Sequence, residues 1–163
     1  MTSLENGTFD YFSPCVVHRL GGTVMSEPAR NRCPDCGRIY YERGPAHMIE
    51  AARVPEERYL AEEFLSALAT SKKSSDRNRL ADVLICLEFY SCGGSLEYPR
   101  EINDLRDGIR EFKIGDVRLP FFDVPDSSTD ALRLTHGFLK KQQQAPREQI
   151  DKAIWVRRED LAS

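Results

Sequence analysis

The chain of 163 residues is long enough for one domain, or for one small domain with a short accessory module. With 40% hydrophobic and 30% charged residues it has the composition of a soluble globular protein, and no apolar run approaches the roughly 20 residues of a membrane-spanning helix. A formal net charge of -3 argues against nucleic-acid binding by the whole surface, because such binding depends on Lys and Arg that displace phosphate counterions.

The amino-terminal segment, residues 1–14, is polar and acidic, and it lacks the charged-then-apolar layout of a secretion signal. We expect this segment to be unordered and the chain to be cytoplasmic, without a membrane partner. The five cysteines are an odd number, and a disulfide framework would be unusual in a cytosolic chain of this length. The cysteines outside apolar helical patterns therefore need another explanation.

Two pairs of potential metal ligands follow in residues 15–44. Cys15-Val-Val-His18 and Cys33-Pro-Asp-Cys36 are separated by fourteen residues, which is the spacing of a four-ligand structural zinc site. We therefore predict a zinc-ribbon-like module in which Cys15, His18, Cys33 and Cys36 bind a structural zinc ion. The alternatives are unrelated residues or a redox pair, although the strand and helix of a thioredoxin-like unit do not accompany the Cys-x-x-Cys motif.

The second domain, residues 45–163, begins after a Gly-Pro break and opens with two predicted helices. The first starts at Pro55, where two glutamates follow that suit the positive end of the helix dipole, and it stops near Thr70. The second is capped by Asp76 or by a serine before it and ends at a Cys-Gly-Gly sequence. Their predicted buried faces consist of Leu60, Phe64, Ala67 and Leu68 in the first helix and of Leu80, Val83, Leu84 and Leu87 in the second.

Three short segments rich in β-branched and aromatic residues predict strands at 109–114, 117–124 and 131–138. A Gly-Asp pair suits a tight hairpin turn between the first two. A last helix is expected to open at Pro146. This order of elements predicts an α+β fold in which a small antiparallel sheet packs on a helical hairpin and a carboxy-terminal helix.

Three strings occur in the second half of the chain, namely Leu105-Arg-Asp-Gly-Ile-Arg-Glu-Phe-Lys-Ile-Gly-Asp-Val-Arg118, His136-Gly-Phe-Leu-Lys-Lys141 and Pro146-Arg-Glu148. In these strings the chain resembles the phage-derived Gp49-like, or HigB-type, toxins of the RelE superfamily. The likeness extends over about residues 45–160 in element order and is specific after Leu105. It implies a RelE-like fold and the toxin of a type II toxin-antitoxin system, a messenger-RNA endoribonuclease. The ribosome and a helix-turn-helix, HigA-like antitoxin would be its partners.

Cleavage of RNA without a metal needs a base for the 2′-hydroxyl, cations for the charge on the phosphorane and an acid for the leaving oxygen. Strand alternation places Arg118 on the face opposite Val117, where it could reach a phosphate. We assign transition-state stabilisation to Arg118, and phosphate binding with a share in proton transfer to Lys113 and Lys140. His136 has the unperturbed pKa that suits acid–base catalysis near neutral pH. Further contacts with RNA are predicted for Arg110, Lys141 and Arg147.

Other interpretations of these residues stay open. His136 alternates in phase with Leu134 and Phe138, which is more typical of a core histidine, and lysines after a strand are commonly just solvated. Pro120 removes a backbone donor from a predicted strand, and Ala145 stands where the toxin family has a helix-capping threonine. The alternative function is therefore a non-catalytic RelE-like module that binds nucleic acid or protein. A third is a phage accessory factor that binds host machinery.

Overall fold

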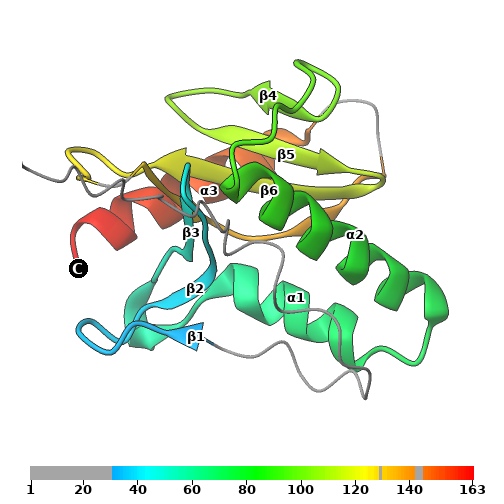
Figure 1. The fold of residues 1–163 in the computed structure, drawn as a ribbon, viewed down its shortest axis with the longest axis horizontal. Helices are drawn as coiled ribbons and strands as arrows, with labels where there is room; N and C mark the ends of the chain where they lie inside the picture. Colours follow the sequence, from blue (N-terminus) through cyan, green and yellow to red (C-terminus); the bar gives the residue numbers. More distant parts are fainter. Residues whose placement is uncertain (1–30, 129, 142–144) are drawn as a thin grey trace, which may run out of the picture.

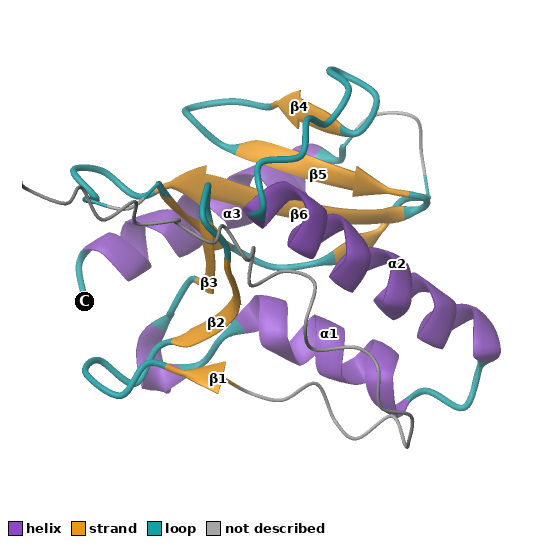
Figure 2. Cartoon of the chain, in the orientation of Figure 1, coloured by secondary structure: helices purple, strands orange, loops and turns teal. Residues whose placement is uncertain are grey.

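The computed structural model describes residues 31–128, 130–141 and 145–163, and its fold is shown in Figures 1 and 2. The segment 1–14 and two of the predicted zinc ligands, Cys15 and His18, lie outside the described residues. In the described ranges no helix is both long and apolar enough to cross a membrane. The elements are, in chain order, β1 (Asn31–Arg32), β2 (Ile39–Arg43), β3 (Met48–Ala51), a 3₁₀ turn (Pro55–Glu57), α1 (Leu60–Thr70), α2 (Ser74–Ser91), β4 (Ile102–Asp104), β5 (Arg110–Ile114), β6 (Val117–Asp123), β7 (Ala131–Leu134), β8 (Phe138–Leu139) and α3 (Arg147–Leu161).

The eight strands of the described residues form one sheet in the order β1-β2-β3-β7-β6-β5-β4, with β8 beside β6. Neighbouring strands run antiparallel except β3 and β7, which run parallel with Met48 opposite Ala131. The predicted α+β class is confirmed. The sheet is mixed and larger than the predicted antiparallel sheet, because β3 precedes the two helices in the chain and lies beside β7 in space.

The amino-terminal strands are continuous with the rest of the sheet. β2 and β3 pair with each other on either side of Gly44 and Pro45, where the sequence shows a break. The carbonyl oxygen of Ser91, at the end of α2, accepts the backbone N–H groups of Ala46 and His47 at 3.0 and 3.1 Å. A Cβ atom on Gly44 would lie 2.1 Å from that carbonyl oxygen, so only glycine fits here. The Gly-Pro sequence therefore forms a tight turn within the sheet.

The helices cover the two faces of the sheet, α1 and α2 on one side and α3 on the other (Figure 1). Side chains of a strand point alternately to its two faces. In β6, Leu119 and Phe121 pack in the core under α1 and α2, whereas Phe122 packs against Ala153 and Val156 of α3. Each face of the central strands therefore contributes to its own hydrophobic cluster.

The buried side of α2 was predicted correctly, since Leu80, Val83 and Leu87 are buried and Leu84 is partly buried. The prediction for α1 was partly wrong. Its buried apolar residues are Ala61, Leu65 and Leu68, whereas Leu60 and Phe64 are partly buried and Ala67 is exposed. The predicted and the observed buried residues of α1 both follow a helical spacing. The two helix faces overlap, so only packing against the sheet decides which of them is buried.

The position of Pro120 is explained by a gap between two partner strands. β6 pairs with β7 through residues 121–123 and with β8 through Val117 and Arg118. The carbonyl oxygen of Pro120 faces this gap and accepts the backbone N–H and the hydroxyl of Thr135, at 2.8 and 3.0 Å. In a strand the N–H and C=O of one residue point to the same side, so the missing N–H of Pro120 faces the interruption and costs no ladder bond.

Candidate functional site

The registers of β4, β5, β6 and β8 bring four polar side chains and one phenylalanine into two rows. These rows lie on the face of the sheet that carries α3. Asn103 lies opposite Glu111 in one row. In the next row Arg118 lies between Lys113 on β5 and Phe138 on β8. Directly opposed residues hold their Cβ atoms about 5 Å apart, so these five side chains form one continuous patch.

This patch forms the floor of a hollow of about 320 Å³. The start of α3 and the segment before it supply one wall, through Ile150 and Ala145. Its lining consists of Asn103, Leu105, Glu111, Lys113, Arg118, Phe138, Lys140, Ala145 and Ile150. Residues of the first two strings singled out in the sequence therefore meet in one place. The third string lies in the chain between two other lining residues, Ala145 and Ile150.

The cations of the hollow are positioned by backbone groups. Nη1 of Arg118 donates to the carbonyl oxygens of Gly115 and Val117, both at 2.8 Å, and the residue is 7% exposed. Nζ of Lys113 donates to the carbonyl oxygen of Pro99 at 2.8 Å. The backbone N–H of Lys140 donates to the carbonyl oxygen of Asp116 at 2.7 Å. Arg118, Lys113 and Lys140 are thus brought together as predicted, with a guanidinium group oriented before any ligand arrives.

Glu111 is the residue of this hollow that the sequence interpretation missed. It is 3% exposed, and its Oε2 atom has no hydrogen-bond partner within the described part of the chain. Burial raises the pKa of its carboxyl group, an effect that the charges of Lys113 and Arg118 and a hydrogen bond from Asn103 oppose. The signal was present in the sequence, because Glu111 alternates in phase with Lys113. A carboxyl group with a raised pKa next to fixed cations is a candidate for proton transfer to or from a bound ligand.

His136 does not line the hollow in the way that its predicted role requires. It is 1% exposed, and its ring nitrogens lie 3.0 Å from Oγ1 of Thr135 and 2.9 Å from Oε1 of Gln149. Burial, with the charge of Lys152, lowers the pKa of His136 to about 4. The imidazole is therefore neutral at physiological pH, and its environment fits the alternative interpretation as a core histidine. Its contact with Gln149 attaches the first turn of α3 to the strand region.

None of the three predicted RNA contacts is among the residues that line the hollow. Arg110 has the phase of Phe112, so it lies on the opposite face of the sheet, where its guanidinium group is 5.0 Å from the ring centre of Phe121 and 3.2 Å from Asp123. Lys141 is exposed. Arg147, at the start of α3, is exposed and pairs with Asp151 at 3.8 Å.

Cys33 and Cys36 lie in the turn between β1 and β2. The backbone N–H of Gly37 donates to the carbonyl oxygen of Cys33 at 2.8 Å, and Gly37 has a φ of +69°, which favours glycine. Hydrogen bonds from the backbone N–H groups of Cys36 and Asp35 lower the pKa of the Cys33 thiol. In the described ranges no group of three or more potential ligands surrounds the pair. The turn nevertheless holds the two thiols in a Cys-x-x-Cys arrangement, and the lowered pKa of Cys33 favours its thiolate, which is the form that binds a metal.

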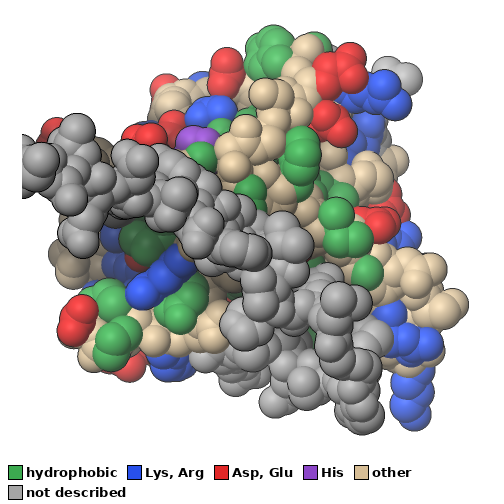
Figure 3. Space-filling model, in the orientation of Figure 1, with side chains coloured by type: hydrophobic (Ala, Val, Ile, Leu, Met, Phe, Trp, Pro, Cys, Tyr) green, Lys and Arg blue, Asp and Glu red, His purple; other side chains and the backbone are tan. Residues whose placement is uncertain are grey.

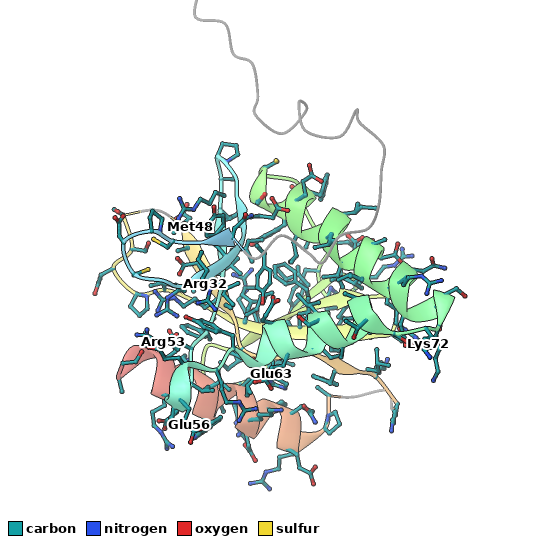
Figure 4. The ribbon with its side chains drawn as sticks, turned by 90° about the horizontal axis from the view of Figure 1, so that it is seen from below. Arg32, Met48, Arg53, Glu56, Glu63 and Lys72 are labelled. Atoms are coloured by element: carbon teal, nitrogen blue, oxygen red, sulfur yellow. The ribbon has the colours of Figure 1, made fainter. Side chains whose placement is uncertain are left out.

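A buried ionic network joins this turn to the end of α3. Asp160 accepts hydrogen bonds from Nη1 of Arg38 and from Nη1 of Arg133, the latter at 2.6 Å. It also accepts the backbone N–H of Arg53 at 2.7 Å. Glu50 on β3 pairs with Nε of Arg133 at 2.9 Å. Figure 4 shows Arg53 beside the carboxy-terminal part of α3. The network therefore connects the amino-terminal strands, β7 and α3.

No protein-family model matches the sequence, and no curated protein matches it either.

Proposed function

We propose that the chain is a metal-independent endoribonuclease, the toxin of a type II toxin-antitoxin system, with a RelE-like fold. One observation carries the proposal. A buried carboxyl group, Glu111, shares a single hollow with three cations, Lys113, Arg118 and Lys140. In the proposed setting the enzyme acts in the cytoplasm on messenger RNA at the ribosome, and a helix-turn-helix, HigA-like antitoxin neutralises it.

In the proposed reaction the 2′-oxygen of a ribose attacks the adjacent phosphorus, and the bond from phosphorus to the 5′-oxygen breaks. Glu111 accepts the proton of the 2′-hydroxyl, and the ammonium group of Lys113 or Lys140 gives a proton to the leaving 5′-oxygen. The products are a 2′,3′-cyclic phosphate and a free 5′-hydroxyl. Arg118 stabilises the charge of the phosphorane, because its guanidinium group is already fixed by backbone carbonyls and need not reorganise.

The proposal is tested by purified protein and a single-stranded RNA whose cleavage ends are mapped. Replacing Arg118 by alanine is expected to reduce kcat by roughly 100-fold to 1,000-fold, as loss of a preorganised transition-state donor does. Arg118→Lys keeps the charge and controls for folding. Arg110→Ala removes a cation from the opposite face of the sheet and is the matched control. Equal cleavage by Arg118→Ala and Arg110→Ala would refute the assignment.

The second candidate function is a non-catalytic RelE-like module that binds nucleic acid or protein. The observation in its favour is the deep burial of Arg118, whose Nη1 donors already engage backbone carbonyls. The same assay separates the two functions, since a binding module retards RNA in a gel without generating new ends. Induced expression of the chain provides a second test. Growth arrest that is relieved by a helix-turn-helix protein from a neighbouring gene would support the toxin function.

We also propose that Cys33 and Cys36 provide two ligands of a structural zinc ion, with Cys15 and His18 as the predicted remaining ligands. The preformed turn and the lowered pKa of Cys33 support this proposal. Metal analysis of the purified full chain should give one zinc ion per chain, and Cys33→Ser should reduce this content. A zinc-free protein that keeps native stability would end the proposal.

A further inference from the structure

The lining of the hollow combines charged and apolar side chains. Lys113, Arg118 and Lys140 supply the positive charge, whereas Leu105, Phe138 and Ile150 supply apolar surface. Phosphate binding needs only the charged residues. The cleavage chemistry therefore leaves the apolar residues unexplained, and they indicate a second part of the ligand.

Phe138 is the aromatic residue among these apolar side chains. It is opposite Arg118 in the register of β6 and β8, so its ring lies next to the predicted phosphate contact. Behind it the ring of His136 is stacked, with 5.8 Å between the ring centres and 22° between the planes. Phe138 itself is only partly buried and lines the hollow, which leaves ring surface accessible from the solvent side. An aromatic ring beside a cation cluster is how proteins stack a nucleobase whose phosphate they bind.

The volume limits the ligand to a small one. About 320 Å³ lies at the lower end of the roughly 300–1,000 Å³ of small-molecule sites, so the hollow fits one nucleotide and not a helical segment. A base inside a duplex is stacked on both sides and cannot enter such a space unless it is unpaired.

We infer that this hollow is a nucleotide subsite in which Phe138, Leu105 and Ile150 hold one unstacked base, while Lys113, Arg118 and Lys140 hold its phosphate. The inference rests on the proposed function for the identity of the ligand as RNA. Its consequence is selectivity for single-stranded RNA with tolerance of base identity, because the wall is apolar and stacking does not depend on hydrogen-bond readout.

Binding tests the subsite without any cleavage. Adenosine 5′-monophosphate and ribose 5-phosphate are titrated into the full chain and followed by amide chemical shifts. The nucleotide is expected to bind roughly 10-fold to 100-fold more tightly, which is the usual contribution of one stacked base. Phe138→Leu should remove most of that difference and leave ribose 5-phosphate binding unchanged. Phe89→Leu is the matched control, because Phe89 is 51% exposed on α2, where hydrophobic side chains are visible on the face away from the hollow (Figure 3).

Cleavage supplies the second arm of the test. An RNA with one abasic residue next to the mapped scissile phosphate should be cleaved roughly 10-fold to 100-fold more slowly by the native protein, and its duplex form should resist cleavage. Phe138→Leu should slow cleavage of the intact RNA but cause no further loss on the abasic one. Equal losses on both substrates, or equal binding of the nucleotide and the sugar phosphate, would overturn the subsite. If the protein binds the nucleotide more tightly than ribose 5-phosphate but cleaves no RNA, the proposed nuclease function is refuted and the proposed subsite is supported.

Discussion

Glu111 and His136 are two buried titratable residues that respond to burial in opposite ways. Removal from water disfavours the charged form of each, so the pKa of Glu111 is raised and that of His136 is lowered to about 4. Glu111 faces the cations of the hollow, whereas His136 contacts the neutral groups of Thr135 and Gln149. Burial therefore favours the protonated form of the Glu111 carboxyl group and the neutral form of the His136 imidazole.

In the proposed cleavage of RNA, replacing Glu111 by glutamine should reduce kcat by roughly 100-fold to 10,000-fold. The isosteric amide cannot accept the proton of the 2′-hydroxyl. In the native protein the rate should fall as the pH is lowered through the raised pKa of Glu111. The pH profile of kcat for the variant should lack this acidic limb. A variant that keeps both the native rate and the native profile would remove Glu111 from the mechanism.

The lowered pKa of His136 predicts a loss of stability in acid. The unfolded chain takes up a proton near pH 6.5, whereas the folded protein takes it up only near pH 4. The contribution of the neutral imidazole is therefore complete above pH 6.5 and declines as the pH falls from 6.5 to 4, by about 3 kcal/mol in total. Urea unfolding at several pH values would measure it. His136→Gln should unfold with a weaker dependence on pH over this range, and parallel curves for the two proteins would contradict the prediction.

The strands and helices show which parts of the fold local sequence can predict. The segments around α2, β5, β6 and α3 were predicted correctly within a few residues, since their hydrophobic periodicity and turn residues agree with their packing. The last predicted strand, 131–138, is divided into β7 and β8. β2 and β3 were not predicted, because the cysteines and the Gly-Pro sequence nearby suggested a separate module. The pairing of β3 with β7 is a long-range contact that no local pattern encodes.

The division between β7 and β8 predicts a strict requirement for glycine at position 137. A Cβ atom there would lie 2.0 Å from the ring of Phe64 on α1. Gly137→Ala should therefore destabilise the protein by roughly 1–3 kcal/mol, the usual cost of overpacking a core. Adding Phe64→Leu should recover part of the loss, which a double-mutant cycle of unfolding free energies would measure. Strictly additive effects would show that the two residues do not conflict.

At the scale of the whole molecule, the network around Asp160 attaches the amino-terminal strands to the carboxy-terminal helix. Strand alternation predicted that Arg118 and Lys113 would share a face, and the register then brought Glu111 and Phe138 beside them. No such rule relates Arg38 to Asp160, which are 122 residues apart in the chain. Contacts of this kind depend on how the sheet and α3 pack, and the sequence alone could not supply them.

Asp160→Asn should destabilise the fold by roughly 3–5 kcal/mol, because Arg38 and Arg133 lose a buried anionic partner. The neighbouring Glu159 pairs only with Arg158 at the surface among the ion pairs of the described residues, so Glu159→Gln should cost no more than about 1 kcal/mol. Chemical denaturation of the two variants gives the comparison. Similar midpoints would contradict a role of the network in holding α3.

The parallel pairing of β3 with β7 has a consequence for synthesis of the chain. Met48 meets Ala131, its partner, only after 83 further residues have been added, and the hollow also needs Ile150 of α3. Domains with such distant pairings fold late and slowly. The sheet and the hollow therefore cannot form until most of the chain has been synthesised, because both need residues near its carboxy-terminal end.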